Sequence, residues 1–531
     1  MRRPPHVHAS RRPGGSRPRA TDQAFPYTAA MTRCIVAPWS ITALALVCAA
    51  CSGGAGTTAD TTATPGTTGP SGGSSESGTS PTSTTTGDPT TGTTGDPTTD
   101  IVTTDIVTTD LATTGSETTD EPADLRSSVT QYGITWTFDA PHAVGQFVTG
   151  DWWVVGPVTI VSMDPAPVAG RHGSMLDPVG DQDYDSRAGR HAEGLRVSFP
   201  LTVEGTHSLV SAISHPDAPE CDQGGADGWL TYDGDCQRGP IQTQAILTVV
   251  AAAPPADAFR PPYAGADKPI HRAFDLCWSA LPKLAPPADL PAAADILRHV
   301  ERPWIDHLNS WTMQHGCATL NMFCYGREVG NIVATLAAYV LVDSPEQQEL
   351  ARRMVQLGID NYGVLQAGGG WGSDGGHFNG RKFPIVFAGA LLGDANMRSP
   401  GVGIGNEDAM TYAGAGGVAL WGRDCDACYL GNGCEYSGDC NNGAKDCRDP
   451  AQMIDGCGDY RNCCTSVTWV GEALAVHALD LAAAWGHDPF LAYVDRWVAG
   501  DVEGGGAASN DFVSAMWTLY RDAPPAVSAC E

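Results

Sequence analysis

The hydrophobic pattern of this chain changes its period once, and that change divides the foldable part in two. Between residues 126 and 255, short β-branched and aromatic runs such as 134–138 and 208–213 are separated by turn residues. Several short strands at this spacing indicate an antiparallel β-sandwich. After residue 291, apolar residues recur at helical spacing, as in 321–342. The sequence therefore predicts an α+β protein in which a β-sandwich precedes a helical domain.

The helical domain is expected at residues 292–531, after a Pro-rich connector at 256–291. Ser344 and Pro345 suit the N-cap and first turn of one helix. Short loops between consecutive helices favour antiparallel hairpins, and stacked hairpins can close into a toroid. We therefore expect a partial α/α toroid. Its other helices are predicted at 345–362, 383–392, 467–485 and 489–498.

Residues 1–51 have the features of an export signal. A charged region after Met31 is followed by an apolar stretch at 41–50 and by small residues before Cys51. Small residues directly before a Cys resemble the lipobox of bacterial lipoproteins, which implies that Cys51 carries a lipid. We expect a lipoprotein anchored at the cell surface or in the periplasm, with plain secretion as the alternative. Residues 1–30 fit an over-extended gene start.

Residues 52–125 are dominated by Thr, Gly, Ser, Pro and Asp. Such a segment has too little apolar surface to offset the entropy lost on ordering. We expect a disordered tether that holds the folded part away from a membrane.

Cysteine usage supports export. The chain has 17 Cys, and setting aside the three in the signal region leaves 14, an even number that favours disulfides. Eight of these lie in an insertion at 424–464, where disulfides are expected to hold a loop with little core. A zinc site at Cys425 and Cys428, or a Ca²⁺ site among the acids of the insertion, are the alternatives. Our main expectation is that the protein has no cofactor.

The formal net charge is -29. This charge argues against a nucleic-acid partner, because phosphates are bound by clustered Lys and Arg. It leaves an anionic polysaccharide open as a substrate, since a few local Arg residues can dominate the field of a cleft.

A glycine-rich loop at 368–382 is the strongest candidate for a site. Glycines let the backbone come close to a ligand, and polar residues of several kinds stand among them. His titrates near neutral pH and suits a general base, while Arg binds carboxylates through a two-pronged fork. A structural loop with a solvated His is the alternative. The candidate residues are Trp371, Asp374, His377, Asn379, Arg381 and Lys382.

Two further loops place polar residues at the starts of predicted helices, where the helix dipole favours anions. A structural ion pair and a disulfide-held loop are the alternative interpretations. In the β half, a polar loop at 171–187 could complete a cleft between the two domains. The candidates are Tyr325, Arg327 and Glu328 in the first loop, and Tyr460 and Arg461 in the second.

An exported chain with a sheet domain, helical hairpins, and Tyr, His, Asn and Arg at helix ends resembles helical-toroid polysaccharide lyases of the alginate and heparinoid type. The resemblance covers about 126–530 and rests on architecture and residue type. It implies β-elimination on a uronic-acid polymer, with Asn379 and Arg381 neutralising the uronate carboxylate. His377 or Tyr325 would then remove the neighbouring proton, and Tyr460 or Tyr325 would protonate the leaving oxygen.

Two other functions remain open. A glycoside hydrolase on the same scaffold needs two carboxylates, for which Asp374 and Glu328 are the best pair. A non-catalytic surface lipoprotein could instead bind glycans or cell wall by stacking tryptophans, such as Trp371, on sugar rings.

Overall fold

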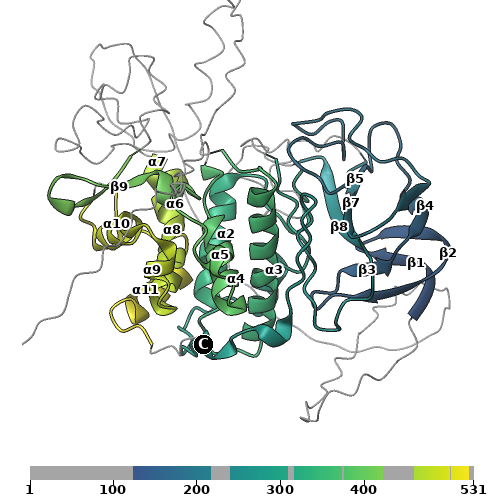
Figure 1. The fold of residues 1–531 in the computed structure, drawn as a ribbon. Helices are drawn as coiled ribbons and strands as arrows, with labels where there is room; N and C mark the ends of the chain where they lie inside the picture. The colour runs from purple at the N-terminus through teal and green to yellow at the C-terminus, as the bar shows by residue number, and fades with distance from the viewer. Residues whose placement is uncertain are drawn as a thin grey trace, which may run out of the picture. The chain divides into compact units, whose positions relative to one another are not determined.

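The computed structural model describes residues 124–216, 239–308, 316–372, 376–422, 460–502 and 504–525 (Figure 1). All of these residues belong to one compact unit of the chain. They contain both a sheet and helices, which confirms the α+β class. The predicted signal with Cys51, the tether and most of the Cys-rich insertion lie outside the described residues. Among the described residues, no helix has the length and apolar character needed to cross a membrane.

The β half forms one mixed sheet with the strand order β5-β7-β8-β3-β2-β4-β6, and β1 pairs with β2. Neighbouring strands are antiparallel, except that β3 and β8 run parallel. The strands are β1 (Asp124–Gln131), β2 (Ile134–Gln146), β3 (Trp152–Val155), β4 (Val158–Asp164), β5 (Ser174–Leu176), β6 (Leu201–Val203), β7 (His207–Ser214) and β8 (Ile241–Val250).

The sheet curls where β2 changes partners. Residues 135–138 of β2 pair with β4, whereas residues 144–146 pair with β3. The sheet continues from β3 to β8 and from β4 to β6, and side chains from both arms enclose a common core. Across this core, Trp136 Nε1 donates a hydrogen bond of 3.0 Å to Ser211 Oγ on β7. The predicted two-sheet sandwich is not confirmed, because hydrogen bonds join strands β1 to β8 into a single curled sheet.

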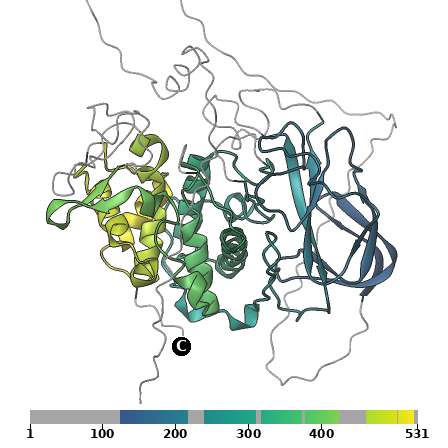
Figure 2. The same ribbon diagram turned by 45° about the horizontal axis from the view of Figure 1, so that its top comes forward.

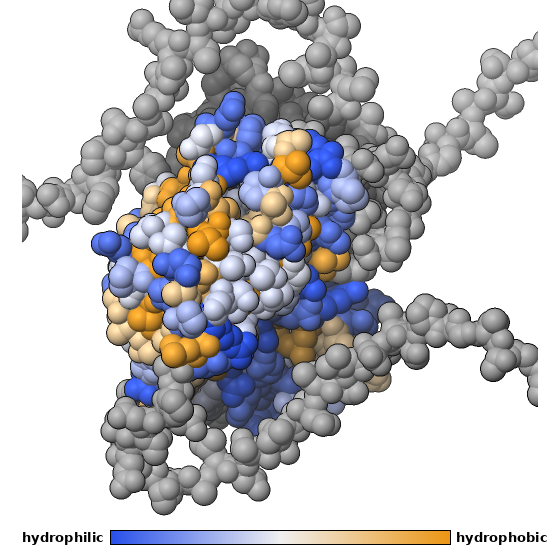
Figure 3. Space-filling view, turned by 90° about the vertical axis from the view of Figure 1, so that its right-hand side faces the viewer, coloured by the Kyte–Doolittle hydropathy of each residue, from blue (hydrophilic) through white to orange (hydrophobic). Residues whose placement is uncertain are grey.

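The outer side of the sheet half carries no large apolar face. The view in Figure 3 shows hydrophilic and hydrophobic residues mixed over this side. Exposed apolar side chains of the sheet half include Leu125, Val161 and Leu195. Single exposed residues of this kind are common on soluble proteins and indicate no docking surface.

Helices make up the second half, and most of them share one large core (Figures 1 and 2). The main helix pairs are α3 with α4 and α2 with α8. The stacked ring of hairpins that a toroid requires is not confirmed. The helices are α1 (Ala293–Leu297), α2 (Gly326–Tyr339), α3 (Gln347–Gln366), α4 (Lys382–Leu392), α5 (Ala395–Arg398), α6 (Asn406–Ala409), α7 (Tyr460–Cys464), α8 (Ser466–Ala478), α9 (Ala482–Trp485), α10 (Asp488–Ala499) and α11 (Asp511–Tyr520), with a short hairpin of β9 (Thr411–Ala413) and β10 (Ala419–Trp421) after α6.

Local sequence explains why α2 and α8 pack so closely. A Cβ built on Gly471 would lie 2.1 Å from the carbonyl oxygen of Ala334, so only glycine allows this approach. Most residues of α4 and α8 are apolar and buried, as expected for helices inside a core. The helix predicted at 467–485 is broken, because Asp480 adopts a left-handed φ of 53° between α8 and α9.

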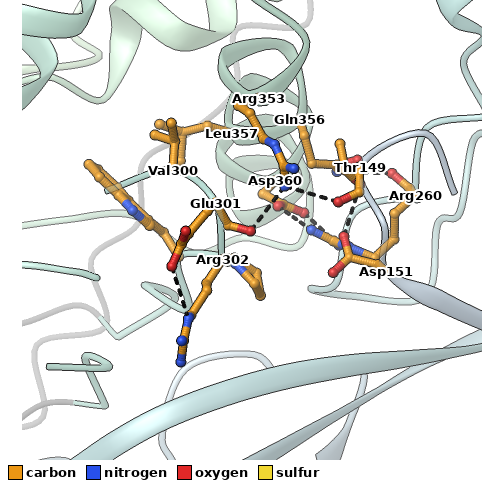
Figure 4. A pocket seen from close by; sticks show the side chains of 12 residues that line it. Thr149, Asp151, Arg260, Val300, Glu301, Arg302, Arg353, Gln356, Leu357 and Asp360 are labelled. Carbon is orange, nitrogen blue, oxygen red and sulfur yellow. Dashed lines mark hydrogen bonds and ion pairs between the residues drawn. The ribbon is translucent and has the colours of Figure 1, made fainter. Parts of the chain in front are cut away.

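A buried charge network joins the two halves. Arg260 of the connector is fully buried and donates to Asp151 at 3.0 Å and to Asp360 on α3 at 2.9 and 2.6 Å. Figure 4 shows these side chains around a small recess, to which Arg353 and Glu301 also contribute. Its volume of about 20 Å³ has room for roughly one water molecule. The recess is therefore a structural junction rather than a substrate pocket.

One disulfide joins two described cysteines, Cys317 and Cys324, whose Cα atoms are 5.5 Å apart. It closes the loop directly before Tyr325 and α2. The disulfide-rich character of the insertion at 424–464 is not confirmed, because most of that segment lies outside the described residues.

Candidate functional site

The three candidate loops of the helical half meet at one place. A Cβ built on Gly326, at the start of α2, would lie 2.0 Å from Cα of His377. A Cβ on Gly376 would lie 2.3 Å from the carbonyl oxygen of Cys464, just before α8. Asn379 Nδ2 donates a hydrogen bond of 2.6 Å to that same oxygen. The starts of α2, α4 and α8 are thus held together, and each brings the positive end of a helix dipole.

Arg381, the residue before α4, forms an ion pair with Asp306 inside this region. Its side chain is 1% exposed, and its Cζ lies 5.5 Å from the ring centroid of Trp371. Among the described residues, no acceptor forms a hydrogen bond with Nε or Nη1 of Arg381. A buried guanidinium with unused donors is suited to take a second anion.

His377 lies beside the same carboxylate, with Nε2 3.7 Å from Asp306 Oδ1. Burial, and to a lesser extent the charge of Arg381, lowers the pKa of His377 to about 3. The imidazole is therefore neutral at physiological pH, which is the form that accepts a proton.

Asp306 is a residue that the sequence analysis missed. Its backbone N–H donates to Tyr263 Oη at 2.8 Å, and Trp371 Nε1 donates to its carbonyl oxygen at 2.8 Å. These bonds fix the peptide of Asp306 and hold its carboxylate near Arg381 and His377. An acid inside the mostly apolar stretch 303–308 is the signal that could have identified it.

Two further acids were also missed, Glu407 on α6 and Glu472 on α8, and both are fully buried. Gly380 N–H donates to Glu407 Oε1 at 2.8 Å, which ties α6 to the glycine-rich loop. Burial raises the pKa of Glu407 to about 7. Burial and the neighbouring Glu407 raise the pKa of Glu472 well above its usual value. A lone acid inside the apolar helix α8 was a sequence signal for this site.

Asn379 and Lys382, predicted to bind substrate, use their polar groups within the protein. Asn379 accepts a hydrogen bond of 3.2 Å from Trp469 Nε1 in addition to its bond to Cys464. Lys382 Nζ donates to Asp408 at 2.6 Å and to the carbonyl oxygen of Trp485 at 2.7 Å. Both residues are fully buried, so they hold the loops and helices in place around the site.

Trp371 is likewise part of the core. Its ring is 5% exposed and packs against Phe378 at a centroid distance of 6.3 Å. In this structure it supports Asp306 and Arg381 and offers no free face for stacking on a sugar.

The remaining predicted residues lie around the same loops. Tyr325 immediately precedes α2, and Arg327 forms an ion pair of 2.7 Å with the adjacent Glu328. Arg461 is buried, with its Cζ 6.0 Å from the ring centroid of Trp421. Tyr460 begins α7. Asp374 and the side chain of Tyr460 lie outside the described residues.

The polar loop at 171–187 satisfies most of its charges internally. Asp183 pairs with Arg196 at 2.9 Å, and Asp185 pairs with Arg187 at 2.7 Å. Tyr184 between them is fully buried and shares a core with residues of the helical half. The loop therefore packs against the helical half, where the ring of Tyr184 lies 6.0 Å from that of His307. The cleft between the domains that this loop could complete is not confirmed.

Among the residues that the structure describes, no three His, Cys, Asp or Glu side chains are arranged to hold a metal ion. The acids and cysteines of the insertion, for which Ca²⁺ and zinc were the alternatives, lie mostly outside those residues. No protein-family model, curated protein or solved structure matches this chain.

Proposed function

We propose that this protein is an exported, surface-tethered polysaccharide lyase that cleaves a uronic-acid polymer by β-elimination. The observation that carries the proposal is the placement of Arg381 and His377 on the same carboxylate, that of Asp306. β-Elimination needs a cation that neutralises the uronate carboxylate and a neutral base that removes the proton next to it. Arg381 has unused donors for the first task. His377 is neutral at physiological pH and lies beside Arg381 on the same carboxylate, which makes it the candidate for the second.

The reaction then proceeds as follows. Arg381 binds the uronate carboxylate as a second anion beside Asp306, which makes the α-proton of that carboxylate more acidic. His377 removes the proton, the C–O bond at the β-carbon breaks, and its electron pair goes to the leaving oxygen. The leaving oxygen takes up a proton, so the products are an unsaturated uronate and a free hydroxyl. The convergent helix starts add a positive field that stabilises the enolate-like intermediate.

Substrate binding requires movement in this site. His377 and Arg381 are 3% and 1% exposed, so a polymer reaches them only after the loops around Gly376 separate locally. The proposal therefore includes an opening of these loops on binding.

The proposal is tested by incubating the purified full chain with alginate, glucuronan and glycosaminoglycans while following the ultraviolet absorbance of unsaturated uronate. We expect His377→Gln and Arg381→Lys to lower kcat/KM by roughly 100-fold or more, because general base catalysis contributes at least that much. The control variants His142→Gln and Arg126→Lys lie in the sheet half and should leave the rate unchanged. Absence of unsaturated product from all these polymers, with a native circular dichroism spectrum, would contradict the proposal.

Other outcomes of the same assay select the other functions. Release of reducing sugar without the ultraviolet signal indicates a hydrolase, and Asp374→Asn should then abolish it. Glu328, the proposed partner of Asp374, is already paired with Arg327 at 2.7 Å, so no observation favours that function. Glycan binding without turnover that survives His377→Ala indicates a binding protein.

We also propose that a lipid on Cys51 anchors the protein to a membrane. The Cys51→Ser variant should then move from the membrane fraction to the soluble fraction of the exported protein. A wild-type protein found entirely in the soluble fraction would contradict the anchor without bearing on the catalytic proposal.

A further inference from the structure

A pair of buried acids behind the proposed site points to a proton held between two residues. Glu407 on α6 and Glu472 on α8 lie within hydrogen-bond reach of each other, and both are fully buried. Ionised carboxylates only accept hydrogen bonds, so a bond between two carboxyl groups needs a proton on one of them. We propose that Glu407 and Glu472 share one proton and act as a single acid–base group of this site.

Most carboxylate oxygens of the pair have no hydrogen-bond donor, which favours a proton that links the two carboxyl groups. Glu407 Oε1 accepts the N–H of Gly380 at 2.8 Å. Within the described ranges, no N–H or O–H donor bonds Glu407 Oε2 or either carboxylate oxygen of Glu472. Three carboxylate oxygens are thus buried without a donor, and a shared proton would satisfy two of them.

The charges around the pair favour one proton rather than none. The charge of Arg381 acts on Glu472, and the charges of Lys382 and Asp408 act on Glu407. Arg381 is already paired with Asp306, and Lys382 with Asp408 at 2.6 Å. Two ionised carboxylates would therefore leave unmatched negative charge in a dry interior, which is costly.

The position of the pair links this proton to the proposed chemistry. Glu407 holds the backbone of Gly380, and Arg381 is the next residue. In the elimination, His377 gains a proton and the leaving oxygen needs one. The pair supplies that proton and becomes doubly ionised. The cycle closes when His377 releases its proton to solvent and the pair takes up one proton from solvent. This catalytic part rests on the proposed lyase activity, whereas the sharing of the proton does not.

The sharing is tested on the full chain without any substrate. The variant Glu472→Gln keeps a hydrogen bond, because its amide donates to ionised Glu407, but it removes the shared proton. The matched control is Glu349→Gln, a partly exposed acid of α3 that pairs with Arg353. We expect the infrared band of a protonated carboxyl group near pH 7 in the wild type and in Glu349→Gln, and its loss in Glu472→Gln.

Denaturant unfolding gives a second readout. Between about pH 5 and about pH 8, the denaturant midpoint of the wild type and of the control should fall relative to the midpoint of Glu472→Gln measured at the same pH, because the histidines contribute equally to all three proteins. A wild type without a protonated carboxyl band near neutral pH would overturn the proposal, whether or not the protein cleaves any polymer. Because this measurement uses the wild type, it decides the question even where Glu472→Gln fails to fold.

The catalytic part has its own readout. In a wild type that cleaves uronate polymers, the alkaline limb of the pH profile of kcat/KM should report the pair, and Glu472→Gln should shift or remove that limb. An unchanged profile would show that the pair is structural, even with the shared proton confirmed by infrared spectroscopy.

Discussion

Asn379 in the glycine-rich loop donates a hydrogen bond of 2.6 Å to the backbone carbonyl of Cys464, 85 positions further along the chain. The same side chain accepts a bond from Trp469 Nε1 in α8. One buried amide thus joins the loop before α4 to the loop before α8. This bond keeps His377 and Arg381 beside the starts of the other helices.

Removing the amide should loosen the whole site. Asn379→Ala removes the hydrogen bond to the Cys464 carbonyl and takes away the acceptor of the Trp469 indole N–H in the interior. The loss of two buried hydrogen bonds should lower the free energy of unfolding by about 2–5 kcal/mol. Denaturant unfolding measures this change. Asn396→Ala, at an exposed position of α5, is the control and should change the stability little.

The contact between α2 and the glycine-rich loop should tolerate no side chain. In Gly326→Ala the new methyl group would overlap the backbone of His377, because the two atoms would be 2.0 Å apart. Separation of the loops should cost roughly 1–3 kcal/mol or more, as overpacking does in well-packed cores. Gly370→Ala, in the same loop but with open space around it, is the matched control. Equal unfolding midpoints for the two variants would argue against the convergence of the loops.

The junction between the two halves should depend on Arg260. Arg260→Met leaves Asp151 and Asp360 buried without their cation, which should cost about 3–5 kcal/mol. Arg272→Met breaks an exposed pair with Asp257, which is screened by solvent, and should change the stability little. Thermal unfolding of the two variants measures these losses of stability. Similar melting temperatures for both would show that the buried network contributes little to the stability of the protein.

Buried neutral histidines should make the protein sensitive to mild acid. Burial lowers the pKa of His307 to about 4, below its unfolded value of about 6.5. The folded state thus binds fewer protons, so this stability is present above pH 6.5 and is lost as the pH falls towards 4. The loss amounts to about 3 kcal/mol for His307 at most. We expect His307→Phe to lose less stability than the wild type over this range, whereas His142→Gln in β2 should behave like the wild type.

Much of the local structure could be predicted from the sequence. The helices expected at 345–362, 383–392 and 489–498 correspond to α3, α4 and α10. Apolar residues recur at helical spacing in α3 and α10, whereas α4 is apolar on nearly all sides. The strand runs at 134–138 and 208–213 lie in β2 and β7. Such helices and strands depend mainly on residues that are neighbours along the chain, so they can be predicted from the sequence.

The arrangement of these helices and strands in space could be predicted less well from the sequence. The curl of the sheet depends on which strands pair along each part of β2, and alternation within a strand gives no information about its partners. The pairing of α2 with α8 depends on the close approach at Gly471, which no local pattern reports. The expected sandwich and toroid were therefore not confirmed, although the class was.

The sequence by itself determined which loops carry the polar residues, including His377 and Arg381 before α4, because polar groups among glycines stand out against apolar helices. Only the tertiary structure decided that these loops meet, and that Asp306, Glu407 and Glu472 complete the cluster. These three acids come from segments far apart in the chain. The protonation state of each acid depends on its burial and on the charges near it in space. The spacing of residues along the chain gives no information about either.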